Sequence, residues 1–128
     1  MEGCYMRRLQ RKRVKGWRKP ENSVIIDRTS KFGNPFKIMG DMIYCDASHR
    51  RKILDKWVFF GMPIKGLEQQ ALVDLHRQWL KGETWDNKVK PCPYTKEEIK
   101  KELAGKDLLC FCKEDQPCHG DNLITICK

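Results

Sequence analysis

The sequence has no long apolar run. None of its stretches approaches the roughly eighteen consecutive apolar residues that a membrane-spanning helix requires, so we expect no membrane partner. The first residues, MEGCYMRRLQRKR, also lack the apolar core of a secretory signal peptide. The sequence therefore predicts a cytoplasmic protein.

The sequence also lacks an even number of cysteines. The chain has seven cysteines, and nothing in it indicates export into an oxidising compartment. An odd number of cysteines in a cytoplasmic protein favours free thiols or metal ligands over a framework of disulfides. The sequence calls for no cofactor, although zinc at some of these cysteines remains an open alternative.

Acidic residues are missing from residues 7–19, RRLQRKRVKGWRK, which hold eight lysines or arginines. Nearly all of the net charge of +9 lies in this basic segment, and such a block attracts phosphates. Lys15 is a candidate phosphate ligand, and Trp17 offers a surface on which a base can stack. The alternative is a solvated tail, but Leu9, Val14 and Trp17 favour a segment that lies against the fold.

The length of 128 residues suits one hydrophobic core, so we expect a single domain over residues 1–128. Strand-like and helix-like segments alternate along it, which predicts an α/β fold with a small Rossmann-like sheet of few strands flanked by helices. The expected strands are residues 23–27 and 107–112. The expected helices are residues 47–60, 67–80, a segment opened by a Thr95 and Glu98 capping box, and a segment from Cys118.

Two of these helices are inferred from apolar spacing. In residues 47–60, Ile53, Trp57 and Phe60 recur at helical intervals. In residues 67–80, the apolar face is expected to carry Leu67, Ala71, Leu75 and Trp79. His76 lies beside that face, so we expect a surface or flanking histidine there.

The loop RTSKFGNPF, residues 28–36, follows the first buried strand. It contains no Walker or dinucleotide-type glycine motif. Its polar side chains Arg28, Ser30, Lys31 and Asn34 are nevertheless candidates for holding a phosphate or a base. Ligands of open α/β folds bind beyond the carboxyl ends of the strands, where this loop would lie. The alternative is a basic surface turn anchored by its two phenylalanines.

The segment LLCFCKEDQPCHGDNL, residues 108–123, brings cysteines close to a histidine and an aspartate. Alternation along a strand would direct Leu109 and Phe111 to one side and Cys110 and Cys112 to the other. The turn would then lead to a helix that begins near Cys118 and His119.

Three interpretations of this C-terminal segment stay open. Cys110, Cys112, Cys118 and His119 have the ligand types of a zinc site, although their spacing differs from the usual pairs of cysteines two residues apart. Alternatively, Cys118, His119 and Asp121 form a catalytic group with an activated thiol. The third interpretation makes Cys110 and Cys112 small buried residues of a sheet.

The series RKRVKGWRKPENSVII, RTSKFGNPF and LLCFCKEDQPCHGDNLI resembles the domain of unknown function family numbered 4326, small proteins of phages and bacteria. The resemblance covers both ends of the chain and implies no reaction. Cys110, Cys112, Cys118, His119 and Asp121 fall on its last motif. The strand end followed by Cys-His is also similar to a second uncharacterised family, numbered 488, from which this chain departs by having Gly120 where an arginine is expected.

Two function classes follow. The first is a protein that binds nucleic acid or a nucleotide, and acts on it through Cys118, His119 and Asp121. The second is a non-catalytic phage accessory protein that binds nucleic acid or a host protein, with structural or zinc-binding cysteines. A phage-encoded protein of either class would work in the host cytoplasm.

Overall fold

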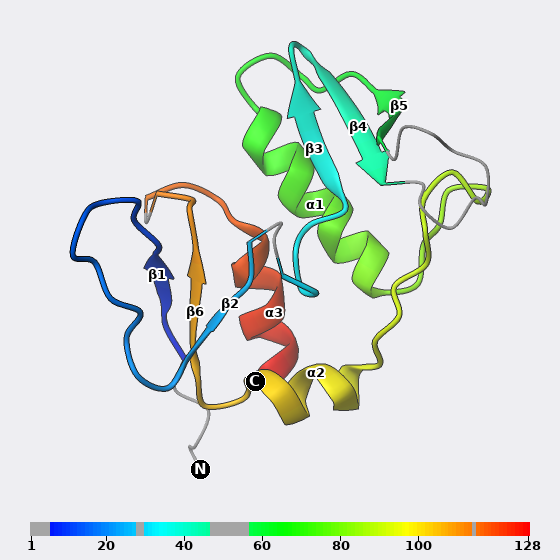
Figure 1. The fold of residues 1–128 in the computed structure, drawn as a ribbon. Coiled ribbons are helices and arrows are strands. Elements are labelled where there is room, and N and C mark those ends of the chain that lie inside the picture. The colour runs from blue at the N-terminus through cyan, green and yellow to red at the C-terminus, as the bar shows by residue number, and fades with distance from the viewer. Residues whose placement is uncertain (1–5, 28–29, 47–56, 114) are drawn as a thin grey trace. The chain divides into compact units, whose positions relative to one another are not determined.

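A computed structural model of the protein describes residues 6–27, 30–46, 57–113 and 115–128. Contacts between residues group the chain into two compact units (Figure 1). Unit 1 consists of residues 1–33 and 94–128, and unit 2 of residues 34–93. The α/β class is confirmed, but the described residues form two three-stranded sheets instead of one. The single domain over residues 1–128 stays a prediction.

Unit 1 contains a parallel sheet with the order β1-β6-β2. Its strands are β1 (Arg8–Gln10), β2 (Ser23–Ile25) and β6 (Asp107–Cys110). The central strand β6 pairs with β1 on one side and with β2 on the other (Figure 1). The short β1 thus fixes the start of the basic segment to the sheet, as predicted from Leu9, whereas Val14 further along is exposed.

Two helices accompany this sheet, α2 (Lys96–Leu103) and α3 (His119–Cys127). Helix α3 packs against β6, and α2 packs against α3. The predicted capping box of α2 is confirmed, because the Thr95 side chain accepts from the Glu98 amide and the Glu98 side chain accepts from the Thr95 amide. The buried core of unit 1 includes Ile26, Phe32, Ile99, Leu103, Leu108, Leu109 and Leu123.

Unit 2 contains an antiparallel sheet, β3 (Phe36–Met39), β4 (Met42–Asp46) and β5 (Trp57–Gly61). Strands β3 and β4 form a hairpin, since Met39 pairs with Met42, and Gly40 between them has a φ of +62°. Helix α1 (Glu68–Leu80) packs against β3. The core of this unit consists of Phe36, Ile43, Cys45, Leu72, Trp79 and Val89.

The helix predicted over residues 47–60 is wrong where the structure describes it. Trp57 and Phe60 belong to strand β5, which pairs with β4, while residues 47–56 lie outside the described residues. Aromatic residues three positions apart are compatible with a helix, but pairing with a neighbouring strand decides the conformation.

The helix predicted over residues 67–80 is confirmed. Trp79 is buried as predicted and Ala71 and Leu75 pack partly buried against the core, but the most buried positions also include Leu72 and His76. Helix α1 begins at Glu68, and Leu67 ahead of it is 52% exposed. The inward face carries Leu72, His76 and Trp79, so the prediction of a surface or flanking His76 is wrong. Its ring packs beside that of Trp79, with 5.7 Å between the centroids.

Candidate metal centre at the end of β6

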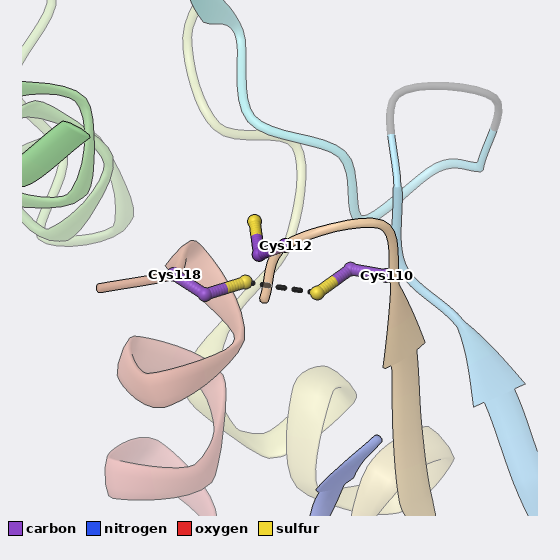
Figure 2. Close-up of side chains that lie close together, drawn as sticks. All are labelled: Cys110, Cys112 and Cys118. Carbon is purple, nitrogen blue, oxygen red and sulfur yellow. Dashed lines mark hydrogen bonds between the residues drawn. The ribbon is translucent and has the colours of Figure 1, made fainter. Parts of the chain in front are cut away.

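Three cysteines of unit 1 converge where β6 ends and α3 begins (Figure 2). Cys110 is the last residue of β6, Cys112 lies in the turn that follows, and Cys118 is the residue that caps α3. Their three Sγ atoms all lie within 4.8 Å of one another, and those of Cys110 and Cys118 are 3.0 Å apart. We call this group the cysteine cluster. Its geometry is suitable for holding one metal ion.

The path of the chain explains this convergence and corrects the predicted alternation. Strand β6 ends at Cys110, so the strand period does not place Cys112, which the turn carries toward Cys110. Leu108, Leu109 and Cys110 are all buried, because a central strand is covered on both faces. The predicted order of strand, turn and helix is confirmed.

The cysteine cluster favours a thiolate. Hydrogen bonds from the thiols of Cys112 and Cys118 lower the pKa of Cys110. The same interactions raise the pKa of Cys112 and Cys118, because each of these thiols keeps its proton while it donates to the Cys110 sulfur. Cys110 and Cys118 are buried, and Cys112 is half-buried. These hydrogen bonds favour the thiolate form of Cys110.

Arg8 of β1 lies beside the cysteine cluster and was not predicted. Its Nε donates to Asp121 Oδ1 at 3.1 Å, and its Nη atoms donate to the carbonyls of Lys113 at 3.1 Å and Gln116 at 2.8 Å. Burial works against its charge, but the Asp121 carboxylate and the sulfurs of Cys118 and Cys110 outweigh this effect and raise the pKa of Arg8. This arginine fixes the turn between Cys112 and Cys118.

His119 is buried at the first turn of α3. Its Nε2 lies 2.5 Å from the carbonyl oxygen of Ile26, and its Nδ1 lies 3.7 Å from the Sγ of Cys118. A carbonyl oxygen only accepts hydrogen bonds, so Nε2 carries the ring hydrogen in the neutral ring. The Nδ1 lone pair is then directed toward the region of the sulfurs.

Asp121, predicted to handle protons, is tied to the start of α3. Its Oδ2 accepts from the Cys118 amide at 3.3 Å, and its Oδ1 accepts from Arg8. The Cys118 sulfur in turn accepts from the Gly120 amide at 3.4 Å. These bonds form a capping box in which a cysteine takes the usual place of a serine or threonine.

The predicted ligand residues of the loop at 28–36 fall in different places. Ser30 donates to the Asp27 carbonyl through its hydroxyl, and Lys31 forms an ion pair with Glu102. Asn34 belongs to unit 2, where its side chain donates to the Leu72 carbonyl and accepts from the Phe36 amide. Arg28 lies outside the described residues. The ligand roles of the described three stay predictions.

In the basic segment, Lys15 is exposed and Trp17 is half-buried, and the Trp17 amide donates to the Val14 carbonyl at 3.1 Å across a turn that includes Gly16. Their binding roles also stay predictions. Arg8 belongs to the same segment, but the sequence contains no signal that separates it from its seven basic neighbours. Only its pairing in β1, next to β6, sets it apart.

Within the part of the chain that the structure describes, no helix is both long enough and apolar enough to cross a membrane. No curated protein matches the sequence, and no solved structure matches the fold. A family model matches residues 9–128, which includes the middle of the chain as well as the motifs at its two ends. The chain therefore belongs to the family described as Domain of unknown function (DUF4326).

Proposed function

We propose that the protein binds nucleic acid or a nucleotide through residues 11–19 of the basic segment. One observation carries the proposal: four cations of this stretch are exposed, and the described residues offer them no acidic partner. They are Lys12, Lys15, Arg18 and Lys19. Cations whose charge is not neutralised within the protein are the ones that attract phosphates.

The beginning of this stretch is anchored to the parallel sheet. The Arg11 amide donates to the Cys110 carbonyl at 2.6 Å, and the Arg11 guanidinium pairs with Asp27 at 2.6 Å. The Arg13 guanidinium lies over the Phe111 ring, 4.1 Å from its centroid. An anchored segment loses less conformational entropy on binding than a free tail does, which favours a binding surface. The half-buried Trp17 adds a partly exposed ring for stacking.

Between the two function classes, the surroundings of the predicted catalytic residues favour binding without chemistry. Cys118 is fully buried, one nitrogen of His119 faces the Ile26 carbonyl, and the Asp121 carboxylate bonds to Arg8 and a backbone amide. A nucleophile needs access to its substrate, and a proton carrier must reach the proton that it transfers. We therefore propose that the cysteine cluster holds zinc in a structural role, in a phage or bacterial protein that works in the cytoplasm.

Binding to labelled oligonucleotides tests the proposal. The full-length protein is titrated into single-stranded DNA, single-stranded RNA and duplex DNA over a range of salt concentrations, with mononucleotides as competitors. The test variant replaces Lys12, Lys15, Arg18 and Lys19 with glutamine. The matched control replaces four exposed lysines elsewhere in the chain with glutamine, namely Lys81, Lys88, Lys96 and Lys101.

The wild type is expected to bind with an affinity that falls as salt rises. Each lost phosphate contact lowers the slope of log K against log salt by about 0.7 to 0.9, so loss of all four contacts should lower the slope of the test variant by about 2.8 to 3.6. The control should retain most of the affinity. Equal losses in both variants would mean that net charge alone attracts the polynucleotide, and an absence of binding by the wild type would overturn the proposal.

A further inference from the structure

The cysteine cluster supplies three ligands, whereas a structural zinc site has four. We propose that Nδ1 of His119 is the fourth ligand, so that Cys110, Cys112, Cys118 and His119 form a closed zinc site of three thiolates and one imidazole. This inference rests on the zinc binding proposed above and is independent of nucleic-acid binding.

The hydrogen bond on the far side of the ring supports this ligand. Metal-binding histidines almost always donate their second ring N–H to a carboxylate, a backbone carbonyl or water. The short contact between Nε2 of His119 and the Ile26 carbonyl, 2.5 Å, has this arrangement. Since Nε2 then carries the hydrogen, the opposite nitrogen, Nδ1, is left with the lone pair that a metal ion requires.

The distances require movement toward a tetrahedral centre. Among the described residues the group whose ligand atoms all lie within 4.8 Å of one another holds the three cysteines without His119, so the His119 ring has to approach the other sulfurs when zinc binds. Zn–S and Zn–N bonds of usual length place a sulfur and a nitrogen ligand about 3.6 Å apart, and two sulfurs about 3.8 Å apart. Nδ1 of His119 is 3.7 Å from the Sγ of Cys118, which meets the first value. The sulfurs of Cys110 and Cys118, now 3.0 Å apart, would separate by roughly 0.8 Å, a displacement that small side-chain rotations accomplish.

Charge compensation is also present. A zinc ion with three thiolates and a neutral imidazole has a net charge of −1, and an uncompensated buried charge is unfavourable. The Arg8 side chain, only 11% exposed, provides a cation whose interaction with the sulfurs of Cys118 and Cys110 favours its charged form. The Gly120 amide donates to the Cys118 sulfur at 3.4 Å, and the N-terminal end of α3 favours negative charge in the same place.

The first experiment identifies the zinc ligands of the wild-type protein directly. The full-length protein is stripped of metal under reducing conditions, loaded with zinc, and measured for metal content and X-ray absorption at the zinc edge. We expect one zinc per chain, with three sulfur neighbours and one nitrogen neighbour that shows imidazole scattering. Zinc with sulfur neighbours and no imidazole would overturn the His119 assignment while leaving zinc binding intact. If the chain binds no zinc, both proposals fail.

Variants provide the second experiment, with cobalt(II) as the spectroscopic probe and zinc affinity measured by competition with a chelator. His119→Gln should lower zinc affinity at least about 100-fold, because loss of a direct ligand exceeds the effect of losing an outer hydrogen bond. His119→Cys should restore tight binding and strengthen the sulfur-to-cobalt charge-transfer absorption. Cys92→Ser, which changes a cysteine of unit 2, is the matched control and should leave affinity and spectrum unchanged. A His119→Gln variant with the affinity and spectrum of the wild type would contradict the inference. If that variant does not fold, the X-ray absorption measurement on the wild type decides whether His119 is a ligand.

Discussion

At the scale of single residues, the start of α3 depends on Gly120, whose lack of a side chain leaves room for its neighbours. A methyl group on Gly120 would lie 2.8 Å from Cδ1 of Ile26 and 3.3 Å from Cδ of Arg8. Ile26 is fully buried, and Arg8 is held by Asp121 and two backbone carbonyls. This crowding explains why glycine suits position 120, since a side chain there would displace both neighbours.

Replacement of Gly120 by alanine is therefore expected to destabilise the protein by about 1–3 kcal/mol, the usual effect of overpacking a core. The free energy of unfolding in urea measures this change. Gly61→Ala is the control, because a methyl group on Gly61 meets no atom within 4 Å. A Gly120→Ala variant as stable as the wild type would show that Ile26 yields without loss.

The second residue to test is Arg8, whose replacement should affect the cysteine cluster. Arg8→Gln keeps a hydrogen-bond donor but removes the cation beside Asp121 and the sulfurs of the cysteine cluster. We expect zinc affinity to fall by about 10-fold to 100-fold, as is typical when a partner of the metal ligands is lost. Arg7→Gln is the matched control, because the Arg7 side chain is 59% exposed and pairs with Asp107 at the opposite end of β6. Similar losses in both variants would point to general charge instead of a specific role for Arg8.

At the scale of elements, helices α2 and α3 begin where local sequence signals placed them, whereas α1 has no side-chain cap and was inferred from apolar spacing alone. Thr95 and Glu98 gave the start of α2 correctly, because a capping box depends only on residues close in sequence. The start of α3 after Cys118 was predicted for a similar reason. Strands β1, β3, β4 and β5 were not predicted. RLQ and WVFFG become strands only by pairing with segments far away or separated by a long connection, and β3 and β4 are short strands joined by a tight turn at Gly40.

The same distinction applies to the candidate site. The sequence predicted Cys110, Cys112, Cys118 and His119 together because they lie within ten residues of one another. It did not reveal Arg8 or the Ile26 carbonyl, which approach the cluster only through the pairing of β1 and β2 with β6. The sequence predicted the same ligand role for Lys31 and Asn34. In the structure, Lys31 pairs with Glu102 in unit 1, whereas the Asn34 side chain donates to the Leu72 carbonyl in unit 2.

The capping box of α2 gives a prediction at this scale. Thr95→Ala should lower stability by about 1 kcal/mol, because the Glu98 amide loses its acceptor. Thermal or urea unfolding detects this loss. The Thr95→Ser variant keeps the hydroxyl and should recover most of the stability; if it is as unstable as Thr95→Ala, the methyl group of Thr95 matters more than the hydrogen bond.

At the scale of the whole molecule, the cysteine cluster and the basic segment both belong to unit 1. Metal bound to the native state stabilises the elements that supply its ligands. Removal of zinc from the full-length protein should therefore speed amide hydrogen exchange in β6 and α3, and leave exchange in α1 and the β3–β4 hairpin of unit 2 nearly unchanged. Mass spectrometry of exchanged peptides measures both responses in one sample. Faster exchange in both units to the same extent would contradict this local effect.

The parallel sheet joins residues that are about as distant in the sequence as the chain permits. In the pairing of β1 with β6, Arg8 aligns with Leu108 and Gln10 with Cys110, while all of unit 2 lies between them in the sequence. During translation, residues 34–93 leave the ribosome before β6 does, because β6 follows them in the sequence. Unit 2 can therefore begin to fold while β1 and β2 still lack their central partner, and the cysteine cluster can form only after both β6 and Cys118 have left the ribosome.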